Sequence, residues 1–292
     1  MNPATKANLV RVSPLPGLFP FLFNTGSFVD RIVTCINTEE QPVTERFLNA
    51  VNSAGLSKNS FHSRYLSAVW PKNNNRFRLA YGKATKFAAV PDAILTMYAD
   101  TMPLTAAQVA LLVAELFRGP KRTRVSLVEW TSDLQGVTVS QLIRTALHKA
   151  RRTKFIEDLR GRKTYYIGAR TSDAQVKFYD KVPGSVVRIE HTLRRGFFRR
   201  HGIRTPSEVF KLRLVDVDEL ISLREISEPR LERAIKSWSP SAKAMARDYV
   251  AFLHPLPQFV QLLRANNIRP EDVLVPSEVH IRLESMARRL VY

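Results

Sequence analysis

Alternation of polar and apolar residues in the middle of the chain is the feature that most constrains its fold. In the segment AQVKFYDK, Val176 and Phe178 fall on one face of an extended strand. The residues between and after them, Lys177, Tyr179 and Lys181, fall on the other face. This period of two predicts a strand with one apolar face and one cationic face that bears a tyrosine.

Two turns divide this stretch into strands. Gly168–Ser172 and Pro183–Gly184 are rich in residues that favour tight turns. We therefore expect a three-stranded antiparallel meander between Thr164 and Arg195. A sheet face lined with cations, a tyrosine and carboxylates suits chemistry on a phosphodiester, whereas an exposed basic surface with one half-buried tyrosine gives the same pattern.

An excess of positive charge limits the kinds of molecule that the chain is expected to bind. The 292 residues include 45 Lys and Arg against 26 Asp and Glu, a net charge of +19. Such an excess favours a polyanion, either nucleic acid or an anionic membrane surface. No apolar stretch is long enough to span a bilayer. One cysteine, Cys35, excludes an internal disulfide and a cysteine-based zinc site. We expect a cytoplasmic protein without a membrane partner.

The rest of the pattern predicts an α+β protein in three parts. We expect residues 1–70 to form an N-terminal α/β extension that packs on the core, and residues 71–204 to form the core with antiparallel sheets. Residues 205–292 are expected to be all helical, since prolines punctuate segments of helical spacing there. The expected strands are 28–36, 77–82, 93–99 and 122–134, and the expected helices are 43–54, 105–117, 140–151, 217–226, 229–238, 241–253, 257–266 and 276–291.

Two short segments of the core resemble each other. Val125–Thr131 and Val186–Thr192 both place a hydrophobic-Glu-x-Thr pattern late in a strand. This similarity indicates a pseudo-twofold core in which each half is a sheet backed by a helix, although two matches this short also arise by chance. Under the twofold hypothesis, Glu129 and Glu190 take equivalent places and can converge.

The meander carries a longer pattern, T-x-Y-hydrophobic-G-x-R-x-S-D…Y-D-K, with R-hydrophobic-E on the next strand. The matching residues are Thr164, Tyr166, Gly168, Arg170, Ser172, Asp173, Tyr179, Asp180, Lys181, Arg188 and Glu190. The segment resembles the trans-acting Rep type of replication-initiation protein from rolling-circle plasmids and filamentous phages, which is related to some conjugative relaxases. The resemblance covers about residues 122–200 and is faint over 76–116.

The resemblance implies a metal-dependent endonuclease that nicks and rejoins one strand at a replication origin through a tyrosine nucleophile. Tyr179 would form the 5′-phosphotyrosine link and leave a free 3′ hydroxyl. Lys177 and Lys181 would favour the phenolate and attract phosphate, and Arg170 would clamp the phosphate. Tyr166 on the neighbouring strand is the alternative nucleophile.

Acidic residues are the candidate metal ligands. Glu129, Asp133 and Glu190 offer the oxygen atoms that Mg²⁺ or Mn²⁺ prefers, although each could instead pair with an Arg or Lys. The chain lacks the His-hydrophobic-His pair of other rolling-circle nucleases. It also has Arg124-Val125-Ser126 where the family carries R-x-D, so Glu129 has to serve as the first ligand. No nucleotide-binding loop is present, and no organic cofactor is expected.

Basic runs mark the expected DNA contacts, because cations hold phosphates and release counterions. A solvated surface is the alternative reading of such runs. The predicted contacts are Arg151, Arg152, Lys154, Arg160, Arg162, Lys163, Arg188, Arg194, Arg195, Arg199 and Arg200. The expected partner is single- and double-stranded origin DNA, and a host helicase and a second copy of the chain are further candidates. The rival hypotheses are a conjugative relaxase, a non-catalytic phage or plasmid regulator, and an RNA-binding structural protein.

Overall fold

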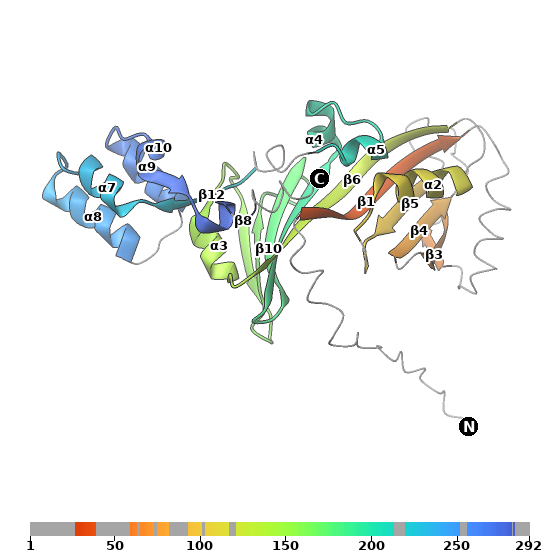
Figure 1. Ribbon diagram of the computed structural model, residues 1–292, viewed down its shortest axis with the longest axis horizontal. Helices are drawn as coiled ribbons and strands as arrows, with labels where there is room; N and C mark the ends of the chain where they lie inside the picture. The colour runs from red at the N-terminus through yellow and green to blue at the C-terminus, as the bar shows by residue number, and fades with distance from the viewer. Residues whose placement is uncertain are drawn as a thin grey trace, which may run out of the picture.

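The fold is built on a ten-stranded antiparallel sheet with the strand order β2-β3-β4-β5-β1-β6-β11-β10-β9-β8. Figure 1 shows the computed structural model, which describes residues 27–38, 59–62, 65–72, 75–81, 93–100, 103–116, 121–212, 220–251, 256–281 and 283. The strands of the sheet are β1 Ser27–Thr38, β2 Asn59–His62, β3 Tyr65–Lys72, β4 Asn75–Tyr81, β5 Ala93–Tyr98, β6 Lys121–Gln135, β8 Thr153–Glu157, β9 Lys163–Ile167, β10 Ala174–Val182 and β11 Val186–Arg194.

The predicted mixed α+β fold with an antiparallel sheet is confirmed, and so is the meander. Strands β9, β10 and β11 are consecutive neighbours, as their alternation predicted. The strand β8 extends the meander to four strands. Alternation did not predict β8, because all five of its residues are exposed and it has no buried apolar face.

The described residues among the first 70 belong to the core sheet itself and not to an extension packed on it. Strand β1 lies in the middle of the sheet between β5 and β6, and β3 runs across position 70. The boundary after residue 204 is also displaced, because α5 (Pro206–Val209) packs against β6 and against α2 (Ala106–Leu116). The predicted helix over 43–54 lies outside the described residues.

Side-chain caps explain where several helices begin. The hydroxyl of Thr105 accepts from the backbone N–H of Gln108, and the Gln108 side chain accepts from the Thr105 N–H. Thr138 and Gln141 form the same reciprocal pair at the start of α3 (Val139–Thr145). A capping box of this kind satisfies two backbone N–H groups at the start of a helix that have no hydrogen-bond partner within the helix. The helix predicted from position 105 is therefore α2.

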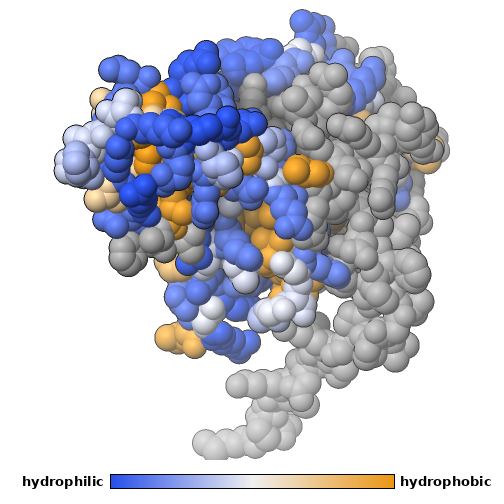
Figure 2. Space-filling model, turned by 60° about the vertical axis from the view of Figure 1, so that its left-hand side comes forward, coloured by the Kyte–Doolittle hydropathy of each residue, from blue (hydrophilic) through white to orange (hydrophobic). Residues whose placement is uncertain are grey.

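The C-terminal part of the chain is not all helical. It contains α7 (Glu228–Ala234), α8 (Pro240–Ala251), α9 (Leu256–Ala265) and α10 (Pro270–Val273), together with two short strands, β12 (Ser222–Ile226) and β13 (Leu274–Pro276). Strand β12 pairs with β13 and with β7 (Ala146–Leu147), which follows α3 directly. Spacing predicted a helix over 217–226, but its described part forms the strand β12. Spacing also predicted a helix over 140–151, but the helix ends at Thr145 and the strand β7 follows. Figure 2 shows that the outer surface of this helical body is mostly hydrophilic.

Apolar side chains gather on one face of the large sheet, where α2, α3, α4 (Arg195–Arg200) and α5 cover them (Figure 1). One cluster surrounds Val128 and Phe197, and a second surrounds Phe178 and Ile189. A third cluster, around Phe259, holds the C-terminal helices together. No helix among the described residues is long and apolar enough to cross a membrane. On the opposite face, the strands β6, β10 and β11 carry charged side chains, among them Glu129, Lys177 and Arg188.

The packing of Phe178 gives the first prediction. Its ring is 0% exposed and stacks with Tyr165 at a centroid distance of 6.2 Å. We expect Phe178→Ala to lower the free energy of unfolding by about 3–5 kcal/mol, because it removes a fully buried ring and leaves a cavity. Urea denaturation measures this loss. The matched control is Phe155→Ala, a ring in the same cross-strand row that is 48% exposed, and equal losses in the two variants would contradict the packing argument.

Candidate functional site

A band of charged side chains crosses the polar face of the sheet, on four neighbouring strands. Antiparallel pairing places Lys177 opposite Glu190, and Tyr179 opposite Arg188. The alternation predicted from the sequence is therefore confirmed for this strand. We call the following residues the polar cluster: Asp30, Arg31, Glu129, Asp133, Lys177, Tyr179, Lys181, Arg188 and Glu190.

The hydroxyl group of Tyr179 contacts a carboxylate. It donates to Glu190 Oε2 at 3.2 Å, and the other oxygen of Glu190 lies 2.9 Å from the Lys177 ammonium. The Lys177 nitrogen also lies 4.5 Å from the centre of the tyrosine ring. Tyr179 is half-buried, so this contact is only partly screened by water. The arrangement places a potential nucleophile within reach of a potential base.

The surroundings of Tyr179 disfavour its phenolate, contrary to expectation. Burial raises the pKa of the hydroxyl, and the negative charge of Glu190 raises it further. The two lysines do not reverse this effect, because Lys177 pairs with Glu190 and Lys181 pairs with Asp133 at 2.7 Å. The hydroxyl therefore stays protonated in the absence of a base that accepts its proton.

A buried ion pair lies next to the tyrosine. Arg188 donates from Nε to Asp133 Oδ1 at 2.6 Å and from a terminal nitrogen to Asp133 Oδ2 at 2.9 Å. It also lies 3.1 Å from a carboxylate oxygen of Asp30. Arg188 is only 5% exposed, so it does not lie on the surface that DNA would contact, and its role as a DNA contact is corrected to that of a buried ion-pair partner.

Asp133 does not fit the role of metal ligand. Both of its oxygens accept from cationic side chains, and the residue is buried. Burial alone would raise the pKa of its carboxyl group, but hydrogen bonds from Arg188 and Lys181 outweigh burial and lower the pKa. A metal ion would have to displace this bidentate contact, which leaves the Arg188 charge uncompensated.

Glu129 and Glu190 form the remaining acidic pair. They lie on the adjacent strands β6 and β11, two residue pairs apart in the register and so on the same face. Burial raises the pKa of Glu129 to about 7, and repulsion from Glu190 adds to this rise, while Arg31 and Lys177 oppose it. Arg31 also forms an ion pair with Glu129. Arg31 and Lys177 balance the two carboxylates in number, but the two carboxylates still repel each other.

This pair fits a hard divalent cation. Mg²⁺ is usually held by one or two carboxylates, with substrate phosphates and water completing its coordination. Glu129 and Glu190 offer two such carboxylates, and their mutual repulsion is what a cation would relieve. Within the described ranges, no group of three or more His, Cys, Asp or Glu residues is arranged to hold an ion. The two carboxylates therefore fit a cation site in which oxygen atoms of the substrate would complete the coordination of the ion.

Most of the other predicted residues lie outside the polar cluster. Arg170 lies in the exposed turn between β9 and β10, where its charge acts on Arg194. Tyr166 pairs with Lys177 across β9 and β10, one strand away from Tyr179. Among the predicted DNA contacts, the exposed ones are Arg151, Arg152, Lys154, Arg160, Arg162, Arg195, Arg199 and Arg200, and the half-buried ones are Lys163 and Arg194.

The sequence interpretation missed Asp30 and Arg31, which complete the cluster from β1. They lie outside the segment that resembles Rep proteins, but adjacent charges at the start of an apolar strand are a detectable signal. A regular strand would turn them to opposite faces. An irregularity in the register between Val29 and Arg31 lets both act on the cluster.

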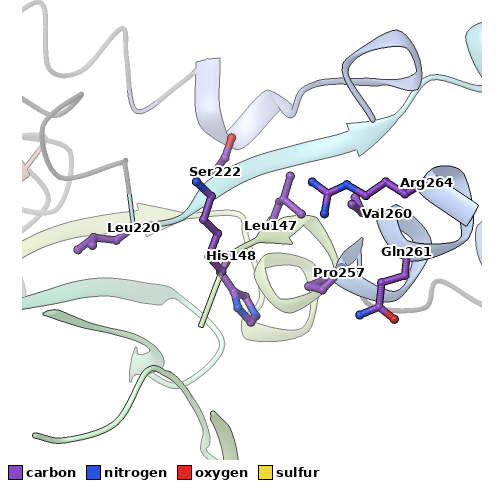
Figure 3. A pocket seen from close by; sticks show the side chains of 9 residues that line it. Leu147, His148, Leu220, Ser222, Pro257, Val260, Gln261 and Arg264 are labelled. Atoms are coloured by element: carbon purple, nitrogen blue, oxygen red, sulfur yellow. The ribbon is translucent and has the colours of Figure 1, made fainter. Parts of the chain in front are cut away.

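A pocket of about 300 Å³ lies away from the polar cluster, between α9 and the β7–β12 pair. Figure 3 shows the imidazole of His148 and the guanidinium of Arg264 among the side chains that line it. None of the residues predicted from the sequence as catalytic, metal-binding or DNA-binding lines this pocket. The chemistry proposed for the tyrosine therefore does not draw on it.

No protein-family model and no curated protein matches the chain. The likeness to trans-acting Rep proteins stays a prediction, and the residues of the polar cluster are where it can be tested.

The buried ion pair predicts a large effect for Asp133→Asn. The change preserves the shape of the side chain but removes the charge that compensates Arg188, so we expect a loss of about 3 kcal/mol in the free energy of unfolding. Denaturation at neutral pH measures this loss. The matched control is Asp173→Asn, which breaks an exposed pair with Arg200 and should cost less than about 1 kcal/mol. A loss no larger than the control's would show that Arg188 does not depend on Asp133.

The raised pKa of Glu129 can be measured by ¹³C NMR of its carboxyl carbon. In the metal-free protein we expect a midpoint near pH 7, and a lower midpoint in Glu190→Gln, because the repelling charge is gone. The folded-state pKa lies above the ordinary value of 4.5. Its contribution to stability is therefore fully present below pH 4.5 and is lost as the pH rises through 7. A midpoint near 4.5 in the unaltered protein would refute the account.

Proposed function

We propose that the chain initiates rolling-circle DNA replication by nicking one strand at an origin, with Tyr179 as the nucleophile. The observation that carries this proposal is the 3.2 Å contact between the Tyr179 hydroxyl and Glu190 on a charged sheet face. A hydroxyl within hydrogen-bond reach of a base is the arrangement that activates a nucleophile. The resemblance of the surrounding residues to trans-acting Rep proteins supplies the substrate class.

Proton transfer is the first requirement of the proposed reaction. Because burial and Glu190 keep the pKa of Tyr179 high, the hydroxyl is protonated at neutral pH and Glu190 has to accept its proton during attack. The tyrosine oxygen then forms a bond to phosphorus, and the bond from phosphorus to the 3′ oxygen breaks. The 3′ oxygen takes up a proton and becomes the hydroxyl that primes synthesis. Attack by a 3′ hydroxyl on the phosphotyrosine reverses these steps and rejoins the strand.

Glu129 and Glu190 are the proposed holders of Mg²⁺ or Mn²⁺, and Asp133 is not. When bound, the ion would neutralise negative charge on the scissile phosphate. The chain's own cations then have separate tasks. Lys177 lies against both Tyr179 and Glu190 and orients them, whereas Lys181 and Arg188 hold Asp133 in place.

We also propose that the core is duplicated, as the sequence predicted, but with other strands as equivalents. Outward from the centre of the sheet, one side reads β1, β5, β4, β3, β2 and the other reads β6, β11, β10, β9, β8. The two lists have the same connectivity, and the central pair β1–β6 is antiparallel, as a twofold axis requires. This order supports an equivalence of β1 with β6 and of β5 with β11. Glu129 and Glu190 would then converge as neighbours in one half, not as equivalents.

A non-catalytic DNA-binding regulator is the second candidate. The observation that favours it is that each acid of the polar cluster contacts a cation of the chain, as in a network that only stabilises the sheet. A relaxase would share the nicking chemistry and differ in its partner. A host helicase and a second copy of the chain remain proposed partners of the initiator.

The test compares the unaltered chain with Tyr179→Phe on supercoiled DNA that carries the protein's own gene and flanking sequence, with Mn²⁺ or Mg²⁺. We expect a nick with the protein linked to the 5′ end, and at least a thousandfold loss in Tyr179→Phe, because the attacking oxygen is gone. The matched control is Tyr165→Phe, on the apolar face, which should nick normally.

Two outcomes would change the assignment. Nicking that survives in Tyr179→Phe but is lost in Tyr166→Phe would move the nucleophile to the neighbouring strand. DNA binding without nicking in any variant would favour the regulator.

A further inference from the structure

The hairpin formed by β8 and β9 stands at the free edge of the large sheet. Strand β8 is the last in the strand order, and each of its five residues is exposed. Its turn, Asp158–Arg162, lies at the same end of the meander as the turn after Val182, because successive turns of a meander alternate between ends. Figure 1 shows these tips at the lower end of the molecule.

The turn of this hairpin is held rigidly although it has no core beneath it. One carboxylate oxygen of Asp158 accepts from the backbone N–H groups of Arg160 and Arg162 at 2.9 and 3.0 Å. The other oxygen accepts from the Arg162 side chain at 2.6 Å. Gly161 closes the turn with a φ of +70°, which a glycine adopts without strain. The shape of the tip is therefore set by local hydrogen bonds.

This rigid turn presents an apolar side chain to solvent. Leu159 is fully exposed, and Val182 is exposed at the neighbouring tip. A single exposed leucine is ordinary on a protein surface. Leu159 differs because a preorganised turn holds it outward beside the exposed cations Arg160 and Arg162, which follow it. Asp158, which precedes it, is occupied by the hydrogen bonds of the turn. An apolar tip beside arginines matches the chemistry of side chains that insert between base steps of a duplex.

The position of the tip relative to Tyr179 suits such a role. Ile156, Thr164 and Tyr179 form one cross-strand row on the polar face, and Leu159 lies three residues beyond Ile156. Strand spacing and rise per residue place Leu159 roughly 14 Å from Tyr179, about four base steps of a duplex. Lys154 and Tyr166 belong to the adjacent row, so the polar face continues from the tyrosine to the hairpin.

We propose that the β8–β9 tip is a wedge that unstacks duplex DNA about four base pairs from the scissile phosphate. The inference rests on the proposed nicking function and deepens it, because an attacking tyrosine on a sheet face needs a strand that has left its duplex. Leu159 enters between base steps, while Arg160 and Arg162 hold the flanking phosphates. Val182 at the second tip supports the separated strand.

The experiment compares Leu159→Ala with Leu111→Ala, an equally conservative change at a leucine on α2 that is 69% exposed. Each variant is assayed on relaxed duplex circles, on supercoiled circles and on a single-stranded oligonucleotide that spans the mapped nick. For Leu159→Ala we expect at least a tenfold loss of nicking on relaxed duplex, a smaller loss on supercoiled DNA, and cleavage of the oligonucleotide within twofold of normal. Leu111→Ala should match the unaltered chain on all three substrates.

Opening of the DNA duplex is measured separately from strand cleavage. In Tyr179→Phe bound to the duplex, permanganate should modify thymines about four nucleotides from the nick position, and the added Leu159→Ala change should abolish this reactivity. Equal losses on duplex and oligonucleotide, or unchanged permanganate reactivity, would overturn the wedge. Failure of the unaltered chain to cleave even the oligonucleotide would overturn the nicking function instead. A loss of binding to anionic lipid vesicles in Leu159→Ala, with DNA opening intact, would assign the tip to a membrane surface.

Discussion

Burial of the Arg188 guanidinium between Asp133 and Asp30 is the interaction on which the polar face depends. A buried cation is costly unless carboxylates satisfy it with good geometry, and here they come from two other strands, β6 and β1. A slip of one residue between β6 and β11 would turn Asp133 toward the apolar core and Leu134 toward the charges. The ion pair therefore helps to fix the register of the central strands. That register in turn places Glu190 opposite Lys177 and beside the Tyr179 hydroxyl.

The part of the site that lies on one strand could be predicted from the sequence. Alternation alone assigned Lys177, Tyr179 and Lys181 to one face and Phe178 to the other, because a strand has a fixed period of two. Contacts between strands could not be predicted in this way. The sequence pattern predicted that Arg188 contacts DNA and that Asp133 binds a metal ion. A local pattern does not reveal that these two residues face each other across β6 and β11.

The same limit explains the errors in the fold. Strand β8 has no apolar face to create a periodic signal, and β12 exists because β7 and β13 pair with it. The predicted equivalence of Glu129 with Glu190 meets a related limit. Both sit in similar short strings of residues, but β6 and β11 are adjacent strands of the sheet, and the duplication proposed above would make β1 the counterpart of β6. Strand order is set by tertiary packing, which a four-residue pattern does not encode.

In the proposed function, the charge balance of the polar cluster decides how DNA would approach the tyrosine. The polar cluster has four carboxylates, on Asp30, Glu129, Asp133 and Glu190, and four cations, on Arg31, Lys177, Lys181 and Arg188. It is therefore close to neutral, although the chain as a whole has a charge of +19. Attraction for phosphate has to come from the exposed arginines and lysines around the cluster, on the β8–β9 hairpin and on α4. Because Arg31 and Lys177 already neutralise the Glu129–Glu190 pair, a divalent ion at the proposed site would add positive charge, and a bound phosphate would balance that charge.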